Sequence, residues 1–262
     1  MSSKSYKARV LVLRKTKLGD KDLIVTMLND GGELMQGVAK GARKPGGSFA
    51  ARLEVFCETE VLMAKGRSLD VVCEARLVNP SKSIAWELDK SSCAAPIAEL
   101  LCHVAQPDLP QPRVFEMSRA AFACLNDDCG SFESRLAVCA ASLWKIVSQI
   151  GFRPSFSSCI SCGNAVDLAS AGDSVALSVA DGGVTCDGCR RPADAVLVET
   201  RVLQWCEAFV MMRFQEIVGC EVDARTCMEV LHLARMWVRA HTGRNLKSLD
   251  FLLTTGIFES GS

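Results

Sequence analysis

The sequence predicts an α+β chain: a small five-stranded barrel, followed by an all-α body that carries an inserted zinc ribbon with four cysteine ligands. Residues 7–78 contain short β-branched runs separated by glycine, asparagine and aspartate, a pattern typical of strands and tight turns. From residue 84 onward apolar residues recur at the three- and four-residue spacing of helices. Two Cys-x-x-Cys motifs interrupt this helical part. We expect a barrel domain over residues 1–80 and a helical domain over 81–262, with the ribbon at about 155–195.

The overall charge hides a strong asymmetry between the two ends of the chain. The 262 residues are 49% hydrophobic and 23% charged, with a formal net charge of zero, so the chain has material for a core and is not disordered. Residues 1–53 contain eleven Lys or Arg and four Asp or Glu, a net charge of +7, which leaves −7 for the rest. The sequence therefore predicts a basic module joined to an acidic body.

Cysteine usage and hydropathy indicate a cytoplasmic protein. Fourteen cysteines would suit a disulfide-rich secreted domain, but no apolar leader segment follows Met1–Lys4 and the chain is too long for that class. Outside the two motifs the cysteines are scattered among apolar residues, where a thiol acts as a small hydrophobe. No run of about 18 apolar residues is present, so we expect no membrane partner.

The first five apolar runs favour an OB-type barrel. Glycine, asparagine and aspartate turns separate them at short intervals, and Asn79-Pro80 closes the module because proline cannot continue a strand ladder. The predicted strands are Ala8–Arg14, Leu23–Leu28, Leu34–Lys40, Glu54–Met63 and Leu69–Val78.

Basic residues at one edge of this barrel predict binding to DNA phosphates. The third strand runs into the loop Lys40–Ser48, in which three glycines allow close backbone approach and three cations neutralise charge. The candidate contacts are Lys15, Lys17, Lys21, Lys40, Arg43 and Lys44. A face kept charged for solubility is the alternative. Aromatic residues are scarce here, so binding should be mostly electrostatic and poorly sequence-specific.

Helical periodicity covers most of the remaining chain. Ser131 can cap one of the helices and Gly151 can end it. A short strand, Ala176–Val179, is expected between the two cysteine motifs. The predicted helices are Ile84–Ala105, Val114–Leu125, Phe132–Ile150, Thr200–Val218 and Asp223–His241.

The four motif cysteines predict a structural zinc site. Cys159 and Cys162 form the first motif, Cys186 and Cys189 form the second, and 23 residues separate Cys162 from Cys186. Two such knuckles supply four thiolates in a tetrahedron, the geometry of closed Zn²⁺ sites. The alternative is two pairs of ordinary thiols. Four protein ligands leave no open position for chemistry, so we expect zinc to hold structure.

The sequence contains no catalytic motif that we can identify, and we expect no enzymatic activity. No phosphate-binding glycine motif, nucleophile elbow or zinc-deaminase signature is complete. His103, His232 and His241 have apolar neighbours, which favours packing or surface roles. Glu99 and Glu133 are isolated helix carboxylates, typical of solvated or capping groups.

The order of several short motifs resembles the RecO family of bacterial recombination-repair mediators. The matching features span nearly the whole chain, and their joint order is more specific than any one of them. They are Lys7–Leu13, the turn at Gly32, Ala39-Lys40-Gly41-Ala42-Arg43-Lys44, Glu99 in a long helix, Ile150-Gly151-Phe152-Arg153-Pro154 leading into Cys159 and Cys162, and Gly243-Arg244-Asn245-Leu246-Lys247-Ser248-Leu249.

This resemblance implies an activity and partners that composition does not. It implies binding of single- and double-stranded DNA, annealing of complementary strands and, with RecR, loading of RecA onto SSB-coated DNA, in the cytoplasm and at the nucleoid. It places Lys40, Arg43 and Lys44 in the family's basic loop, and Arg244 and Lys247 in its basic C-terminal segment. Gly46-Gly47 departs from the family, which often has another basic residue there. A different hypothesis is a protein-docking adaptor that binds DNA weakly and does not anneal it.

Overall fold

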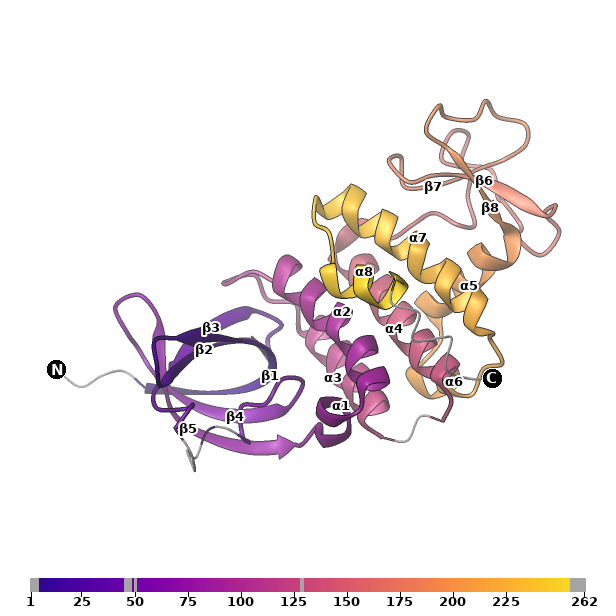
Figure 1. Ribbon diagram of the computed structural model, residues 1–262. Helices are drawn as coiled ribbons and strands as arrows, with labels where there is room; N and C mark the ends of the chain where they lie inside the picture. Colours follow the sequence, from indigo (N-terminus) through magenta and orange to yellow (C-terminus); the bar gives the residue numbers. More distant parts are fainter. Residues whose placement is uncertain (1–4, 45–48, 50, 128–129, 255–262) are drawn as a thin grey trace. The chain divides into compact units, whose positions relative to one another are not determined.

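The computed structural model describes residues 5–44, 49, 51–127 and 130–254, in two compact units, Met1–Asp128 and Cys129–Ser262 (Figure 1). The second half of the predicted basic loop, residues 45–48, lies outside the described residues. The expected domain boundary at residue 80 falls inside the first unit, directly after its last strand.

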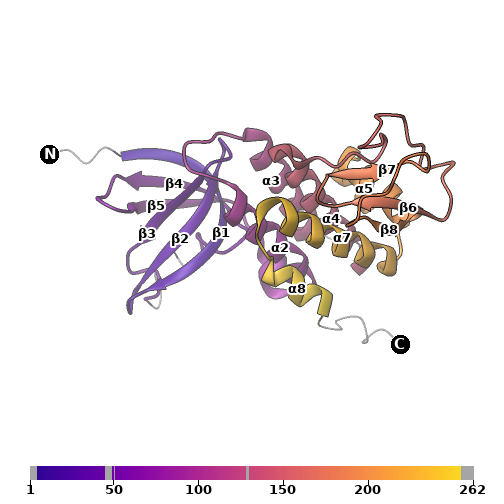
Figure 2. The same ribbon diagram turned by 90° about the horizontal axis from the view of Figure 1, so that it is seen from above.

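The first unit contains the predicted five-stranded barrel. The barrel is closed, because β1 pairs with both β2 and β4, and the strand order is β1-β2-β3-β5-β4. Among these strands only β3 and β5 pair in parallel. Figure 2 shows β1, β2 and β3 side by side. The strands are β1 (Ser5–Leu18), β2 (Asp22–Asn29), β3 (Leu34–Ala39), β4 (Glu58–Ala64) and β5 (Asp70–Asn79).

Alternating side chains fill the barrel, as the period of two along each strand requires. Val10 and Val12 from β1 meet Val25 and Met27 from β2 inside it. The predicted fourth strand started at Glu54, whereas β4 begins at Glu58. The intervening residues form a turn in which Phe56 has φ 71° and the Cys57 N–H donates to the Glu54 carbonyl. Val12 of β1 still accepts from the Phe56 N–H and donates to the Cys57 carbonyl, so the segment joins β1 through an irregular turn and not as a regular strand.

Gly32, in the turn between β2 and β3, packs against the segment that precedes α3 (Pro112–Asn126). The Gln111 N–H donates to the Gly31 carbonyl at 2.7 Å, and Gly32 has φ +78°. A Cβ atom at Gly32 would lie 2.0 Å from the Gln111 carbonyl oxygen. Glycine is therefore required both by the backbone conformation and by this close approach.

We expect Gly32→Ala to lower the free energy of unfolding by more than the roughly 1–3 kcal/mol of a strained backbone alone, because a clash is added to the strain. Urea denaturation of the full chain measures the change. Gly19→Ala is the matched control, since Gly19 also has positive φ in a barrel turn but would place its Cβ in open space. Equal losses in the two variants would show that the Gln111 contact is unimportant.

Three helices complete the first unit: α1 (Lys82–Trp86), α2 (Leu88–Val104) and α3. The sequence predicts one helix over Ile84–Ala105, but the structure breaks it at Glu87, which is extended. The Glu87 carboxylate lies 3.0 Å from the ammonium of Lys90, a buried lysine. This ion pair compensates the burial of the Lys90 ammonium, because a buried charge needs a partner.

In the described part of the second unit, three helices pack around α4 (Phe132–Val147). Its neighbours are α5 (Thr200–Met211), α6 (Phe214–Val218) and α7 (Ala224–Thr242), and α8 (Lys247–Thr254) packs on α7. Ser131 caps α4 as predicted, because its hydroxyl accepts from the Ser134 N–H at 3.3 Å. The single helix predicted over Thr200–Val218 is two helices, because Met212 and Arg213 are extended. α8 was not predicted.

α4 continues into a π-helical turn, η1 (Ser148–Phe152), in which Gly151 has φ 102° and ends the helix. The Trp237 indole N–H donates to the Phe152 carbonyl at 2.9 Å, and the ring of His241 stacks on that of Phe152. The turn is thus held by aromatic residues of α7.

Between η1 and α5 the chain forms a small antiparallel sheet of order β7-β6-β8 (Figure 1). Its strands are β6 (Ser174–Ser178), β7 (Gly183–Thr185) and β8 (Val196–Glu199). The predicted strand between the cysteine motifs corresponds to β6. Among the helices that the structure describes, none combines the length and apolar composition needed to cross a lipid bilayer.

Candidate metal centre and nucleic-acid interface

The four motif cysteines meet at one point. The sulfur atoms of Cys159, Cys162, Cys186 and Cys189 all lie within 4.8 Å of one another. The Cys162 and Cys186 sulfurs are 3.7 Å apart. Four sulfurs bound tetrahedrally at about 2.3 Å from Zn²⁺ are about 3.8 Å apart. The cluster can therefore hold a metal ion, and its geometry and all-thiolate chemistry suit zinc.

Backbone hydrogen bonds shape each knuckle and prepare it for a charged sulfur. In the first knuckle the Gly163 N–H donates to the Cys159 carbonyl at 2.9 Å, and in the second the Cys189 N–H donates to the Cys186 carbonyl at 3.1 Å. The Cys186 N–H donates to the Cys159 sulfur at 3.3 Å. Backbone N–H groups of Cys186 and Cys162 lower the pKa of Cys159 to about 6, because these hydrogen bonds favour the thiolate.

The candidate DNA-binding cations lie at one end of the barrel. β3 ends at Ala39, which pairs with Leu23, and Leu23 also pairs with Lys17 of β1. The loop after β3 therefore lies beside the β1–β2 turn. Five exposed cations gather here, and we call them the basic end: Lys17, Lys21, Lys40, Arg43 and Lys44.

Hydrogen bonds join the two turns of the basic end. The Arg43 guanidinium donates to the carbonyls of Gly19 and Asp20, both at 3.0 Å, and the Arg43 N–H donates to the Lys21 carbonyl. The Asp22 carboxylate accepts from the Gly41 N–H at 2.7 Å. Arg43 thus supports the loop as well as adding charge, a role that its sequence position did not reveal.

Lys15 differs from the other candidates. It is half-buried, and its ammonium lies 2.5 Å from the Glu54 carboxylate. This pairing offsets its charge locally, so the basic end is a stronger phosphate site than Lys15.

Arg244 and Lys247 lie in the second unit, where both are exposed. Arg244 follows the end of α7, and Lys247 is the first residue of α8. The basic end belongs to the first unit, so these two residues form a separate candidate surface.

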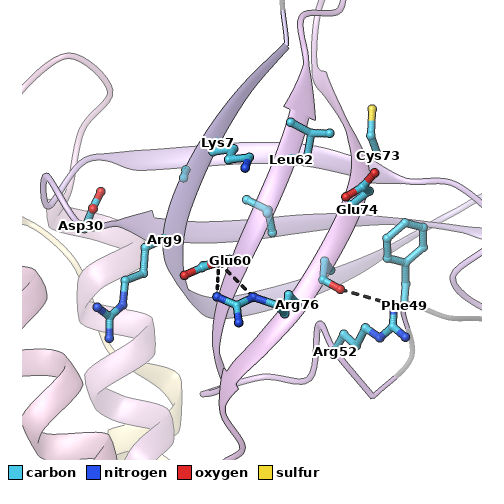
Figure 3. A pocket seen from close by; sticks show the side chains of 13 residues that line it. Lys7, Arg9, Asp30, Phe49, Arg52, Glu60, Leu62, Cys73, Glu74 and Arg76 are labelled. Carbon is cyan, nitrogen blue, oxygen red and sulfur yellow. Dashed lines mark hydrogen bonds and ion pairs between the residues drawn. The ribbon is translucent and has the colours of Figure 1, made fainter.

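A groove of about 850 Å³ crosses the outer face of β1, β4 and β5 (Figure 3). Sequence reasoning missed its cations, which lie opposite acids on neighbouring strands: Glu60 of β4 is in register with both Arg9 of β1 and Arg76 of β5. Arg76 pairs with Glu60 at 2.6 Å, and Arg9 pairs at 2.5 Å with Glu58, whose side chain is only 4% exposed. The Arg76 guanidinium holds the pKa of Glu60 below its usual range. The groove's carboxylates offset its cations, so phosphate should prefer the basic end.

The histidines and isolated carboxylates occupy ordinary structural positions. His103 is one helical turn from Glu99 on α2, with 3.9 Å between nitrogen and carboxylate oxygen. His241 packs against Trp237, and burial lowers the pKa of His232. Glu133 lies in the first turn of α4, where a hydrogen bond with Ser131 lowers its pKa. These positions agree with the packing and capping roles expected of them.

Two family models cover most of the chain. Residues 1–81 match "Recombination protein O N terminal" and residues 86–250 match "Recombination protein O C terminal". The chain belongs to the RecO family. The resemblance seen in the sequence is thereby confirmed, and the family is one of DNA repair and recombination proteins.

Individual RecO relatives match between 71% and 94% of this chain. The DNA repair protein RecO of Desulfitobacterium hafniense (strain DSM 10664 / DCB-2) is 32% identical over 188 residues, which cover 71% of this chain but only 64% of that relative. The DNA repair protein RecO of Bifidobacterium longum (strain DJO10A) is 29% identical over 94% of this chain and 98% of its own length. That of Nostoc sp. (strain PCC 7120 / SAG 25.82 / UTEX 2576) is 29% identical over 73% of this chain and 67% of its own.

Proposed function

We propose that this RecO family member is a non-enzymatic DNA-binding mediator that anneals complementary single strands. The observation that carries the proposal is the basic end, where two turns joined by hydrogen bonds present five exposed cations. Cations held together can neutralise the phosphates of two strands and lower the repulsion that opposes pairing. Annealing of this kind needs no nucleotide hydrolysis, and the sequence contains no nucleotide-binding loop that we can identify.

The proposal assigns parts of the chain to separate tasks. The barrel, residues 1–80, binds DNA through the basic end, with a smaller contribution from Lys15, and residues 81–262 form the second domain. The gap between the two family matches, residues 82–85, supports this division. Arg244 and Lys247 add a second DNA contact. Zn²⁺ on the four cysteines stabilises the ribbon and takes no part in chemistry.

Partners follow from the family. We include RecR, SSB and RecA in the proposal: with RecR, the chain would help load RecA onto SSB-coated DNA, in the cytoplasm. An adaptor that docks proteins and binds DNA only weakly is the second candidate, and the net charge of −7 outside residues 1–53 favours it.

Annealing of two complementary labelled oligonucleotides by the purified full chain separates the two candidates. We expect the chain alone to accelerate annealing, and RecR and SSB homologues to change the rate on SSB-coated strands. A chain that binds neither strand, or that binds without accelerating annealing, would favour the adaptor.

A further inference from the structure

The two outer strands of the ribbon sheet, β7 and β8, differ in whether their outer edge is hydrogen-bonded. The outer side of β7 is covered, because the Val184 N–H donates to the Ser155 carbonyl and the Ile160 N–H donates to the Val184 carbonyl, both at 2.9 Å. β8 pairs with β6 along Val196–Glu199, and no other described segment pairs with it. The sheet therefore keeps one open edge, with backbone donors and acceptors directed outward.

This open edge is apolar. Val196 is 37% exposed and Leu197 is 59% exposed, and Val198 between Leu197 and Glu199 is half-buried. Sheet edges are usually protected by shortness, charged side chains, proline or a bulge, since an unprotected apolar edge pairs readily with another chain. β8 has four residues and ends at the charged Glu199, but Val196–Val198 contains no charged residue and no proline. Its composition favours pairing with a further strand.

The surroundings of the edge are negatively charged. Residues 155–199 contain six Asp or Glu and two Arg, a net charge of −4, and four thiolates around a divalent ion would add about −2. Glu199 is paired with Arg201 at 3.0 Å. Asp173, Asp187 and Asp194 form no ion pair with any residue in the described part of the chain. A polyanion such as DNA is repelled here, whereas a cationic segment is attracted.

We propose that the β8 edge binds an extended, basic polypeptide segment, which adds to the sheet as a fourth strand. Main-chain hydrogen bonds to β8 would supply affinity, as in other cases of strand addition. Apolar side chains of the segment would cover Val196 and Leu197, and the net negative charge of the ribbon would attract its Lys or Arg residues. This site does not depend on DNA binding by the barrel.

The test uses the full-length zinc-loaded chain and fluorescein-labelled twelve-residue peptides. One alternates lysine with valine, a second alternates glutamate with valine, and a third is the lysine peptide with alternate backbone nitrogens methylated. We expect the lysine peptide to raise anisotropy and to slow hydrogen exchange in residues 196–199. Leu197→Lys should weaken that binding about tenfold or more, because apolar contact is lost and a like charge is added.

Leu88→Lys is the matched control, since Leu88 is an exposed leucine of the first unit, and it should bind as the parent does. Zinc content and melting temperature verify that Leu197→Lys is folded; the methylated peptide tests the same edge without any substitution and should bind weakly. The proposal is overturned if the glutamate or methylated peptide binds as well as the lysine peptide, or if Leu197→Lys binds normally. A concentration-dependent dimer that Leu197→Lys dissociates would assign the edge to a second copy instead, and would equally overturn it.

Discussion

Cys186→Ser should release the metal ion and unfold the ribbon while leaving most of the DNA affinity of the barrel intact. The substitution removes one of four converging thiolates. Structural zinc contributes on the order of 10 kcal/mol to the folding of small isolated zinc domains. We therefore expect zinc content per chain to fall well below one and the ribbon to melt at a lower temperature.

Cys73→Ser is the control for this change, because Cys73 is an exposed thiol of the barrel. It should keep its zinc and its melting temperature. Metal analysis, thermal unfolding and oligonucleotide binding on the same samples separate the possibilities. Loss of DNA binding by a Cys186→Ser chain whose barrel is still folded would show that the ribbon belongs to the DNA surface, contrary to our assignment.

Lys40→Glu combined with Lys44→Glu should weaken binding to every DNA sequence tested. Each phosphate contact on a single strand contributes about 0.7 to the slope of log K against log salt, so the loss of two contacts costs about 25-fold in affinity at about 0.1 M salt. The slope itself should become shallower by about 1.4. Arg43 is left unchanged because its guanidinium also holds the loop against Gly19 and Asp20.

A second double variant, Arg67→Glu with Lys82→Glu, separates a local effect from the change in net charge. Both residues are exposed cations of the first unit: Arg67 precedes β5 and Lys82 begins α1. Fluorescence anisotropy over a salt series is the measurement. Equal losses in the two double variants would mean that only total charge matters and that the basic end is not a binding site.

Local sequence patterns were sufficient to predict the barrel and the cluster of four cysteines. Strand periodicity and turn residues depend on neighbours in the chain, and the predicted barrel is present, with β1 longer than expected and β4 starting later. The cysteine knuckles are local as well, because each Cys-x-x-Cys turn brings its own two sulfurs together. The spacing predicted that the two pairs meet at one site, and the cluster of four sulfurs confirms this.

Features that depend on contacts between residues far apart in the sequence could not be predicted in this way. The sequence gives no sign that Lys15 is paired. Its partner Glu54 is 39 positions away, and the two side chains come into contact only in the folded barrel. The role of Arg43 depends on the β1–β2 turn lying beside the loop after β3. The ion pairs of the groove likewise require the register of β1, β4 and β5, and the open edge of β8 requires knowledge of which strands pair.

The salt dependence of single-strand binding by the unmodified chain tests the central claim most directly. Affinity for a labelled oligothymidylate and for a mixed-sequence strand is measured between about 50 and 500 mM salt. If the five cations of the basic end each contact a phosphate, they alone contribute about −3.5, so both strands should give a slope at least that steep. A slope near zero, or no binding at the lowest salt, would contradict a DNA-binding role for this end of the barrel.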